Sequence, residues 1–277
     1  MARTIVNGTH VKLNDGHLMP LLGIGCWQGE HKPMSEAIVL ALNNGYRLID
    51  TAYSYMNEEA VGEAIRRWGG DRKDIFVTTK LPTIALGGGR VEPFLRKSLK
   101  KLGLDYVDLY LIHAPVGLQY VDDETVFPFD KDGKLMVDYS TNHVALWREM
   151  EAVREAGLAR SIGVSNFSTA QLRRLFAVAK VPPAVNQLEM HVEFQQTEMQ
   201  AYSRETGLVL TSYGTLGSPG RRARIQENSQ VLDWSLSEEA MAALRTLDRG
   251  EEARSFNFLK NRGFELHPEC PVNRPVL

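Results

Sequence analysis

Cysteine is scarce in this sequence. Cys26 and Cys270 are the only two, and they lie near opposite ends of the 277 residues. Two distant thiols do not build the disulfide framework of a small secreted domain, so we expect a reducing, cytoplasmic environment. Neither cysteine has partners at metal-ligand spacing, and no further histidine or cysteine joins Glu189, His191 and Glu193 in a recognisable pattern. We therefore expect no metal.

A surplus of positive charge and long apolar runs are also missing. The formal net charge is −2, whereas nucleic acid or an anionic membrane would favour a basic excess. No apolar run approaches membrane-spanning length, and residues 1–8 lack the apolar core of a secretory signal. We expect a monomer whose partner is a small molecule, with neither nucleic acid nor a membrane as partner.

Short apolar runs that end in a polar residue alternate with amphipathic helical stretches along the chain. With 43% hydrophobic residues the chain can bury a large core, and one domain over residues 1–277 is expected. The alternation predicts an α/β fold, a (β/α)8 barrel whose parallel strands bring their carboxyl ends to one face. A hairpin over 11–20 precedes the barrel, a long binding loop or lid spans 115–139, and 249–277 is expected to be a loop.

The predicted elements follow one another in a regular order. Strands are expected at 21–24, 46–50, 75–79, 104–111, 161–164, 184–188 and 208–212. Helices are expected at 33–44, 58–68, 90–101, 142–155, 169–179, 196–206 and 237–247. No eighth strand is recognisable after Tyr213, so the barrel is expected to be incomplete.

Four residues with chemical potential fall at or just after three consecutive strand ends. Asp50, Tyr55, Lys80 and His113 should converge on the carboxyl face of the barrel. Three of them have an ordinary alternative: a helix cap for Asp50, a salt bridge at the barrel mouth for Lys80, and a satisfied polar side chain for His113. Their joint placement favours an active site.

The sequence resembles the aldo-keto reductase family at two motifs. The first is Gly45-x-Arg47-x-x-Asp50-Thr51-Ala52-x-x-Tyr55-x-x-Glu58-x-x-x-Gly62. The second covers residues 150–167 and ends in Gly163-Val164-Ser165-Asn166-Phe167. The likeness extends over residues 11–220 and resumes at Arg224, so it covers most of the chain.

The resemblance implies NADPH-dependent reduction of an aldehyde or ketone to an alcohol. Tyr55 would protonate the developing alkoxide, and Lys80 would supply the cation that makes this transfer easier. Asp50 would pair with the lysine, while His113 would orient the carbonyl oxygen by a hydrogen bond.

The resemblance also implies a set of cofactor and substrate contacts. Ser165, Asn166 and Gln187 would bind the nicotinamide carboxamide, and Tyr213 would stack on the nicotinamide ring. The other cofactor positions are Gly25, Leu216, Ser218, Arg224 and Asn228. Trp27 would line the substrate pocket, and Ala114 stands where the family usually has a tryptophan, which predicts a wider pocket.

The second half of the chain departs from the family between Gly220 and Arg224. The family has a helix, the eighth strand and an Ile-Pro-Lys-Ser motif there, and the motif holds the cofactor 2′-phosphate. A loss of about one strand-helix unit predicts weaker NADPH binding. A shortened or splice-variant reductase, an omitted stretch of sequence and a scaffold without catalysis are the three explanations.

Two other functions stay open on the residues alone. The first is a catalytically weakened or inactive reductase-like protein with a binding or regulatory role. The second, more distant one is a metal-dependent barrel hydrolase.

Overall fold

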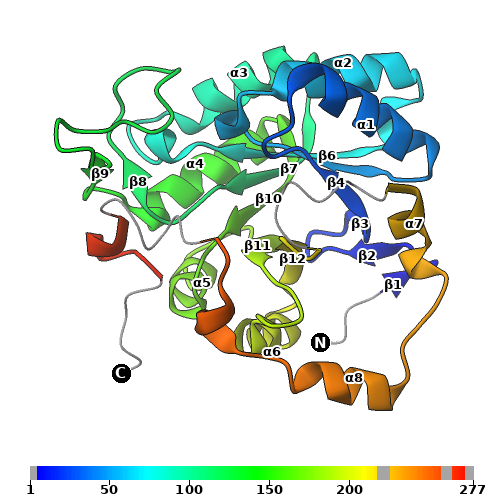
Figure 1. Cartoon of the computed structure of the whole chain (residues 1–277). Helices are drawn as coiled ribbons and strands as arrows, with labels where there is room; N and C mark the ends of the chain where they lie inside the picture. The colour runs from blue at the N-terminus through cyan, green and yellow to red at the C-terminus, as the bar shows by residue number, and fades with distance from the viewer. Residues whose placement is uncertain (1–4, 217–224, 257–263, 272–277) are drawn as a thin grey trace.

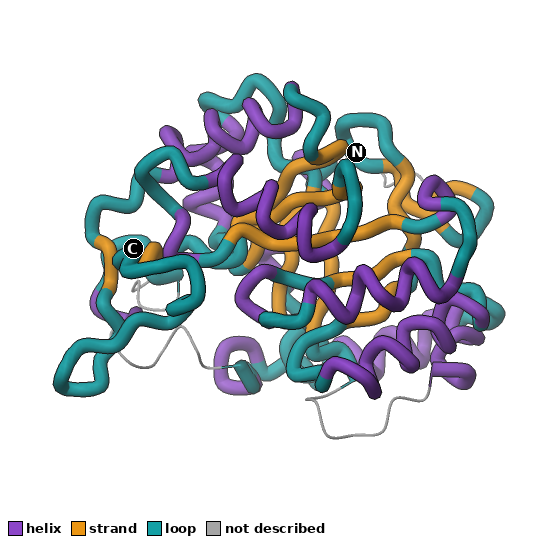
Figure 2. Tube along the Cα trace, turned by 90° about the horizontal axis from the view of Figure 1, so that it is seen from above, coloured by secondary structure: helices purple, strands orange, loops and turns teal. Residues whose placement is uncertain are grey.

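The computed structural model describes residues 5–216, 225–256 and 264–271. A seven-stranded parallel sheet curves into a nearly closed barrel, with helices around it (Figure 1). Figure 2, turned by a right angle, shows the strands in the middle and the helices outside them. The predicted α/β barrel with seven recognisable strands is confirmed.

Neighbouring barrel strands follow one another in chain order. The strands are β4 (Gly23–Gly25), β5 (Leu48–Asp50), β6 (Phe76–Leu81), β7 (Val107–Ile112), β10 (Ala159–Ser165), β11 (Val185–Glu189) and β12 (Val209–Tyr213). The helices between them are α1 (His31–Asn43), α2 (Glu58–Trp68), α3 (Val91–Leu102), α4 (His143–Glu155), α5 (Thr169–Phe176) and α6 (Thr197–Thr206). The predicted elements are found, with α5 ending before residue 179.

Local chemistry sets the helix ends. Helix α2 stops where Gly69 takes a left-handed conformation with φ of 71°, which glycine adopts without a Cβ clash. Helix α5 begins with a capping box, in which the Ser168 hydroxyl accepts the Gln171 N–H and the Gln171 side chain accepts the Ser168 N–H. These signals place each helix between two strands, and so place the strand ends that carry the site.

The predicted hairpin closes the amino-terminal end of the barrel. It consists of β2 (His10–Lys12) and β3 (Leu18–Pro20), and β1 (Ile5–Val6) adds a third antiparallel strand. Val11, Leu13 and Met19 are buried against the first residues of barrel strands, such as Phe76 and Val209. The other barrel end, where the strands finish, is left for the site.

Strands β4 and β12 are the two edges of the sheet. Ile24 pairs with Ile49, and the Cys26 N–H donates to the Asp50 carbonyl. Because successive residues of a parallel strand direct their backbone hydrogen-bonding groups to opposite sides, the N–H and C=O groups of Gly23 and Gly25 face away from β5, toward the open side. Among the described residues no strand pairs with either edge. The expected incomplete barrel is therefore observed in the part of the chain that the structure describes.

Helices α7 and α8 come after the edge strand β12 in the chain. Helix α7 (Ile225–Ser229) packs beside α1, where the buried Ile225 contacts Ala41 and Tyr46 and its carbonyl accepts the Tyr46 hydroxyl at 3.0 Å. Helix α8 (Glu238–Arg245) buries none of its residues and lies at the lower edge of Figure 1. Both lie outside the barrel.

The long loop 115–139 is packed against the molecule over part of its length. It carries β8 (Gly117–Leu118) and β9 (Val137–Asp138), which pair in antiparallel fashion. Leu118 and Val137 are buried in the main core. The described part of the segment 249–277, which was expected to be a loop, contains two short 3-10 helices, Gly250–Ala253 and Phe264–Leu266. Among the described helices, none is both long and apolar enough to cross a membrane.

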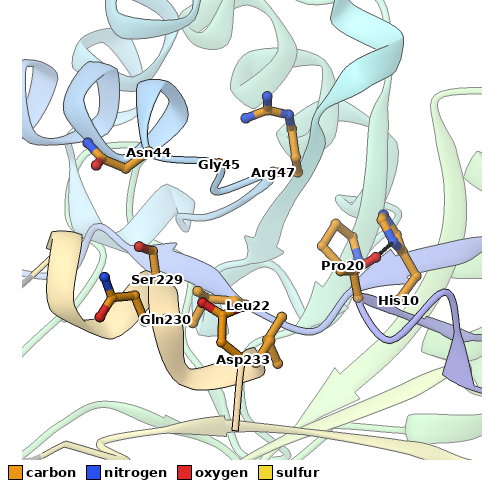
Figure 3. A pocket seen from close by; sticks show the side chains of 11 residues that line it. His10, Pro20, Leu22, Asn44, Gly45, Arg47, Ser229, Gln230 and Asp233 are labelled. Atoms are coloured by element: carbon orange, nitrogen blue, oxygen red, sulfur yellow. Dashed lines mark hydrogen bonds between the residues drawn. The ribbon is translucent and has the colours of Figure 1, made fainter.

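A cavity of about 230 Å³ lies between the hairpin, the α1–β5 connection and the residues after α7. Figure 3 shows His10 and Pro20 on one side and Ser229, Gln230 and Asp233 on the other. None of the predicted site residues that the structure describes lines it. The cavity is at the amino-terminal side of the barrel, so it is separate from the site described next.

Candidate active site

A buried ion pair joins the ends of neighbouring strands. Asp50 is the last residue of β5, and Lys80 lies near the end of β6, which pairs with β5. The Lys80 Nζ donates to Asp50 Oδ1 at 2.5 Å, and the lysine side chain is 0% exposed against 17% for the aspartate. A lysine so deeply buried needs this partner, because an unpaired buried charge is costly.

The Lys80 ammonium group uses all three of its protons. Besides Asp50 it donates to the Thr51 carbonyl at 2.9 Å and to the Tyr55 hydroxyl oxygen at 3.2 Å. Burial works to lower the pKa of Lys80, but the Asp50 charge and Tyr55 outweigh it, so the pKa is raised. Lys80 is therefore charged and has no further proton to offer a ligand.

Tyr55 ends the short 3-10 helix Tyr53–Tyr55 that follows β5. Burial raises its pKa, and the Lys80 charge offsets part of that rise. Because the Tyr55 oxygen accepts a hydrogen bond from Lys80, its own proton remains available to an acceptor on the other side. The predicted pairing of Tyr55, Lys80 and Asp50 is thus present as geometry.

His113 follows β7 directly and faces Tyr55. The two ring centroids are 5.5 Å apart, with the planes at 74°. Burial, aided by the Lys80 charge, lowers the pKa of His113 to about 3. The imidazole is therefore neutral near pH 7, so it can donate a hydrogen bond without carrying charge.

Three amide and hydroxyl side chains meet beside this group. Ser165 is the last residue of β10, Asn166 follows it, and Gln187 lies in the neighbouring strand β11. The Asn166 amide donates to the His113 carbonyl and to Ser165 Oγ, each at 3.0 Å, while Gln187 Nε2 donates to Asp50 Oδ2 at 2.8 Å. Asn166 has a φ of 64°, a left-handed conformation that asparagine tolerates better than most residues.

These contacts join the predicted catalytic and cofactor residues into one network. Tyr213, at the end of β12, donates its hydroxyl to Asn166 Oδ1 at 2.8 Å, and burial raises its pKa. Trp27 is 42% exposed beyond β4, so its ring is available at the opening. Ala114 is 1% exposed in the main core and offers little surface to a ligand, so the expectation of a pocket rests on Trp27.

Hydroxyl and amide groups make up this cluster, and many of their protons are used within it. The Ser165 hydroxyl donates to the Gln187 carbonyl, and both Asn166 amide protons are used on His113 and Ser165. Gln187 gives one amide proton to Asp50, which leaves its second proton and its side-chain oxygen as the groups able to meet a carboxamide. Of the other residues predicted to contact the cofactor, Leu216 is 68% exposed and Asn228 is half-buried on α7. Ser218 and Arg224 lie outside the described residues. Gly25 is exposed beside Asp50, its partner in β5.

Some residues at the site were not expected from the sequence. The Thr51 carbonyl is a backbone acceptor, which no side-chain pattern reveals. Phe256 packs edge to face with Trp27 at 5.6 Å and with Tyr213 at 5.3 Å between ring centroids. Its segment carries no periodic pattern, so only the tertiary contact identifies it.

The chain is similar to known proteins over most of its length. The model described as "Aldo/keto reductase family" matches residues 21–256. Aldo-keto reductase family 1 member C13 of Mus musculus is 39% identical over 287 residues, which covers 94% of this chain and 88% of that protein. Dihydrodiol dehydrogenase 3 of Bos taurus is 41% identical over 290 residues, with 95% and 89% covered.

A solved structure gives the same result. The aldose reductase from Schistosoma japonicum superposes with a TM-score of 0.86 at 33% identity, covering 95% of this chain and 98% of that one. The two sequence alignments above are longer than the 277 residues of this chain. Those relatives therefore carry residues that have no counterpart here.

Proposed function

The chain belongs to the aldo/keto reductase family, and from this premise we propose that it reduces aldehydes or ketones to alcohols with NADPH, with Tyr55 as proton donor. The proposal is carried by the direction of one hydrogen bond. Lys80 donates to the Tyr55 oxygen, which leaves the phenolic proton for the substrate. The neighbouring groups are less suitable acids, because Lys80 uses its protons elsewhere and His113 is neutral.

Each group has one task in the proposed reaction. When bound, the nicotinamide cofactor supplies the hydride that reduces the carbonyl carbon. His113 donates a hydrogen bond that orients the carbonyl oxygen toward Tyr55, and Tyr55 transfers its proton to that oxygen. The fixed positive charge of Lys80 stabilises the phenolate left behind, and Asp50 keeps Lys80 in place.

A second set of residues is proposed to hold the cofactor. Ser165, Asn166 and Gln187 would bind the nicotinamide carboxamide, and Tyr213 would contact the ring. Gly25, Leu216, Ser218, Arg224 and Asn228 are proposed for the remainder of the cofactor. Support comes from the hydrogen bonds that connect Asn166 to the His113 backbone and Gln187 to Asp50.

A second function is favoured by the open edge between β4 and β12. A barrel left open beside the cofactor residues would bind NADPH more weakly, which would leave a reductase-like binding protein with little catalysis. This alternative keeps the same fold and differs in weaker cofactor binding and lower turnover.

The experiment is an assay of NADPH absorbance with an aromatic aldehyde, together with cofactor binding by quenching of protein fluorescence. A steady absorbance loss supports the reductase. Cofactor binding without turnover supports the alternative. If the protein shows neither cofactor binding nor turnover, both proposed functions are wrong. Tyr55→Phe should abolish turnover and leave cofactor binding intact. Tyr53→Phe is the matched control, because it removes a nearby hydroxyl that bonds the Asp123 carbonyl instead.

A further inference from the structure

One buried carboxylate near the site has no role in the proposed reaction. Glu189 is the last residue of β11, two positions after Gln187, and its side chain is 0% exposed. A carboxylate removed from water needs several donors, since burial of a charge without partners is strongly unfavourable. The donors that it has identify what it holds.

Both carboxylate oxygens of Glu189 bind the backbone of the carboxyl-terminal segment. Oε1 accepts the Ser255 N–H at 2.6 Å, and Oε2 accepts the Phe256 N–H at 3.0 Å. His191 Nε2 lies 3.3 Å from Oε1. Hydrogen bonds to an ionised acceptor are stronger than neutral ones, and two on consecutive amides fix both position and orientation.

The held segment carries the Phe256 ring to the opening of the site. Phe256 packs against Trp27 on one side and against Tyr213 on the other. Its ring also lies directly over Gly214, where an added Cβ would come within 2.6 Å of Phe256 Cε2. The ring therefore bridges β4 and β12 across the opening of the site.

A nearby cation, Arg254, anchors the residues before Phe256. Arg254 is 10% exposed, pairs with Glu251 and lies with its guanidinium carbon 4.7 Å from the Phe194 ring centroid. Burial works to lower the pKa of Arg254, but Glu251, and after it Tyr213 and Glu189, outweigh burial, so the pKa is raised. The residues before Phe256 are thus held by charge as well as by hydrogen bonds.

We propose that Glu189 is a positioning residue that holds Phe256 beside Trp27 as part of one aromatic wall for the carbonyl substrate. The proposal rests on the reductase function proposed above. Such a wall favours carbonyl compounds with a flat apolar body, since aromatic rings gain from edge-to-face and stacked contact.

The test compares an aromatic aldehyde with a short aliphatic aldehyde at saturating NADPH. Glu189→Ala and Phe256→Ala should each raise KM for the aromatic aldehyde about tenfold, with kcat and the KM of the short aldehyde changed less than about twofold. Glu189→Gln keeps one acceptor oxygen and should fall between wild type and Glu189→Ala. The double variant should match the single ones, because both act on the same wall.

Glu151→Gln is the matched control. Its carboxylate accepts two consecutive backbone N–H groups, those of Lys180 and Val181, far from Phe256 along the fold. This change should leave KM for both aldehydes as in wild type. If Glu151→Gln raised KM for the aromatic aldehyde as much as Glu189→Ala does, the change in KM would reflect a general loosening of the fold. That result would overturn the proposal.

A second measurement does not depend on turnover. Hydrogen exchange at the Ser255 and Phe256 amides should be slow in wild type and faster in Glu189→Ala, with strand β11 still protected. Unchanged exchange at these amides would overturn the hold by Glu189. Faster exchange with no change in KM for the aromatic aldehyde would overturn the proposal that Phe256 forms a wall for the substrate. If wild type shows no turnover, the reductase proposal fails on its own, and exchange still decides the hold.

Discussion

The neutral state of His113 predicts a defined loss of stability in acid. Its folded pKa of about 3 lies below the reference value of 6.5. Between pH 6.5 and about pH 3, the histidine is therefore protonated in the unfolded chain and neutral in the folded protein. The free energy of unfolding falls as the pH drops through this range. At about pH 5 the loss amounts to about 2 kcal/mol relative to about pH 7.5. The figure depends little on how far the folded pKa lies below 5.

The perturbation is His113→Gln, which removes the titration and keeps a polar side chain. The free energy of unfolding would be measured by urea titration with circular dichroism for wild type and variant at both pH values. Other titrating groups contribute equally to both proteins, so the difference between their pH effects isolates His113. The variant should lose about 2 kcal/mol less than wild type in acid.

A matched control is His31→Gln, since His31 is 57% exposed and far from this network. It should show the acid loss of wild type. Equal acid losses in wild type and His113→Gln would refute the assignment of a neutral imidazole, and with it the reasoning that leaves Tyr55 as the proton donor.

Three further predictions follow from the same contacts. Asp50→Asn should lower the free energy of unfolding by about 3 kcal/mol, because Lys80 stays buried without its anion, and it should also abolish turnover. The control is Asp108→Asn, which disturbs a remote ion pair with Arg72 and should lower stability in urea titration while it leaves activity unchanged. The stability that Lys80 adds is complete below its unfolded pKa of 10.5 and is lost as pH rises through the higher folded value, so Lys80→Met should flatten this alkaline loss in unfolding measured against pH. Ser168→Ala should cost about 1 kcal/mol by breaking the α5 capping box, with unchanged kcat in the aldehyde assay.

The alternation of strands and helices was readable from the sequence because its causes are local. Helix α2 was predicted at its observed bounds, since the spacing of its apolar residues and Gly69 are both local signals. The carboxyl ends of β5, β6 and β7 were also identified, which placed Asp50, Lys80 and His113 together. Parallel strands made that convergence a consequence of topology.

The chain by itself determined the barrel, the seven strands and the identity of the candidate catalytic group, because short-range periodicity and strand-end residues encode them. Only the tertiary structure decided that Lys80 directs its third proton to Tyr55, that burial keeps His113 neutral, and that Glu189 binds the backbone next to Phe256. These depend on desolvation and on contacts between segments far apart in the chain. Neither desolvation nor a long-range contact can be recognised in a local sequence pattern, because its contribution to the free energy of folding arises only when the distant segments come into contact.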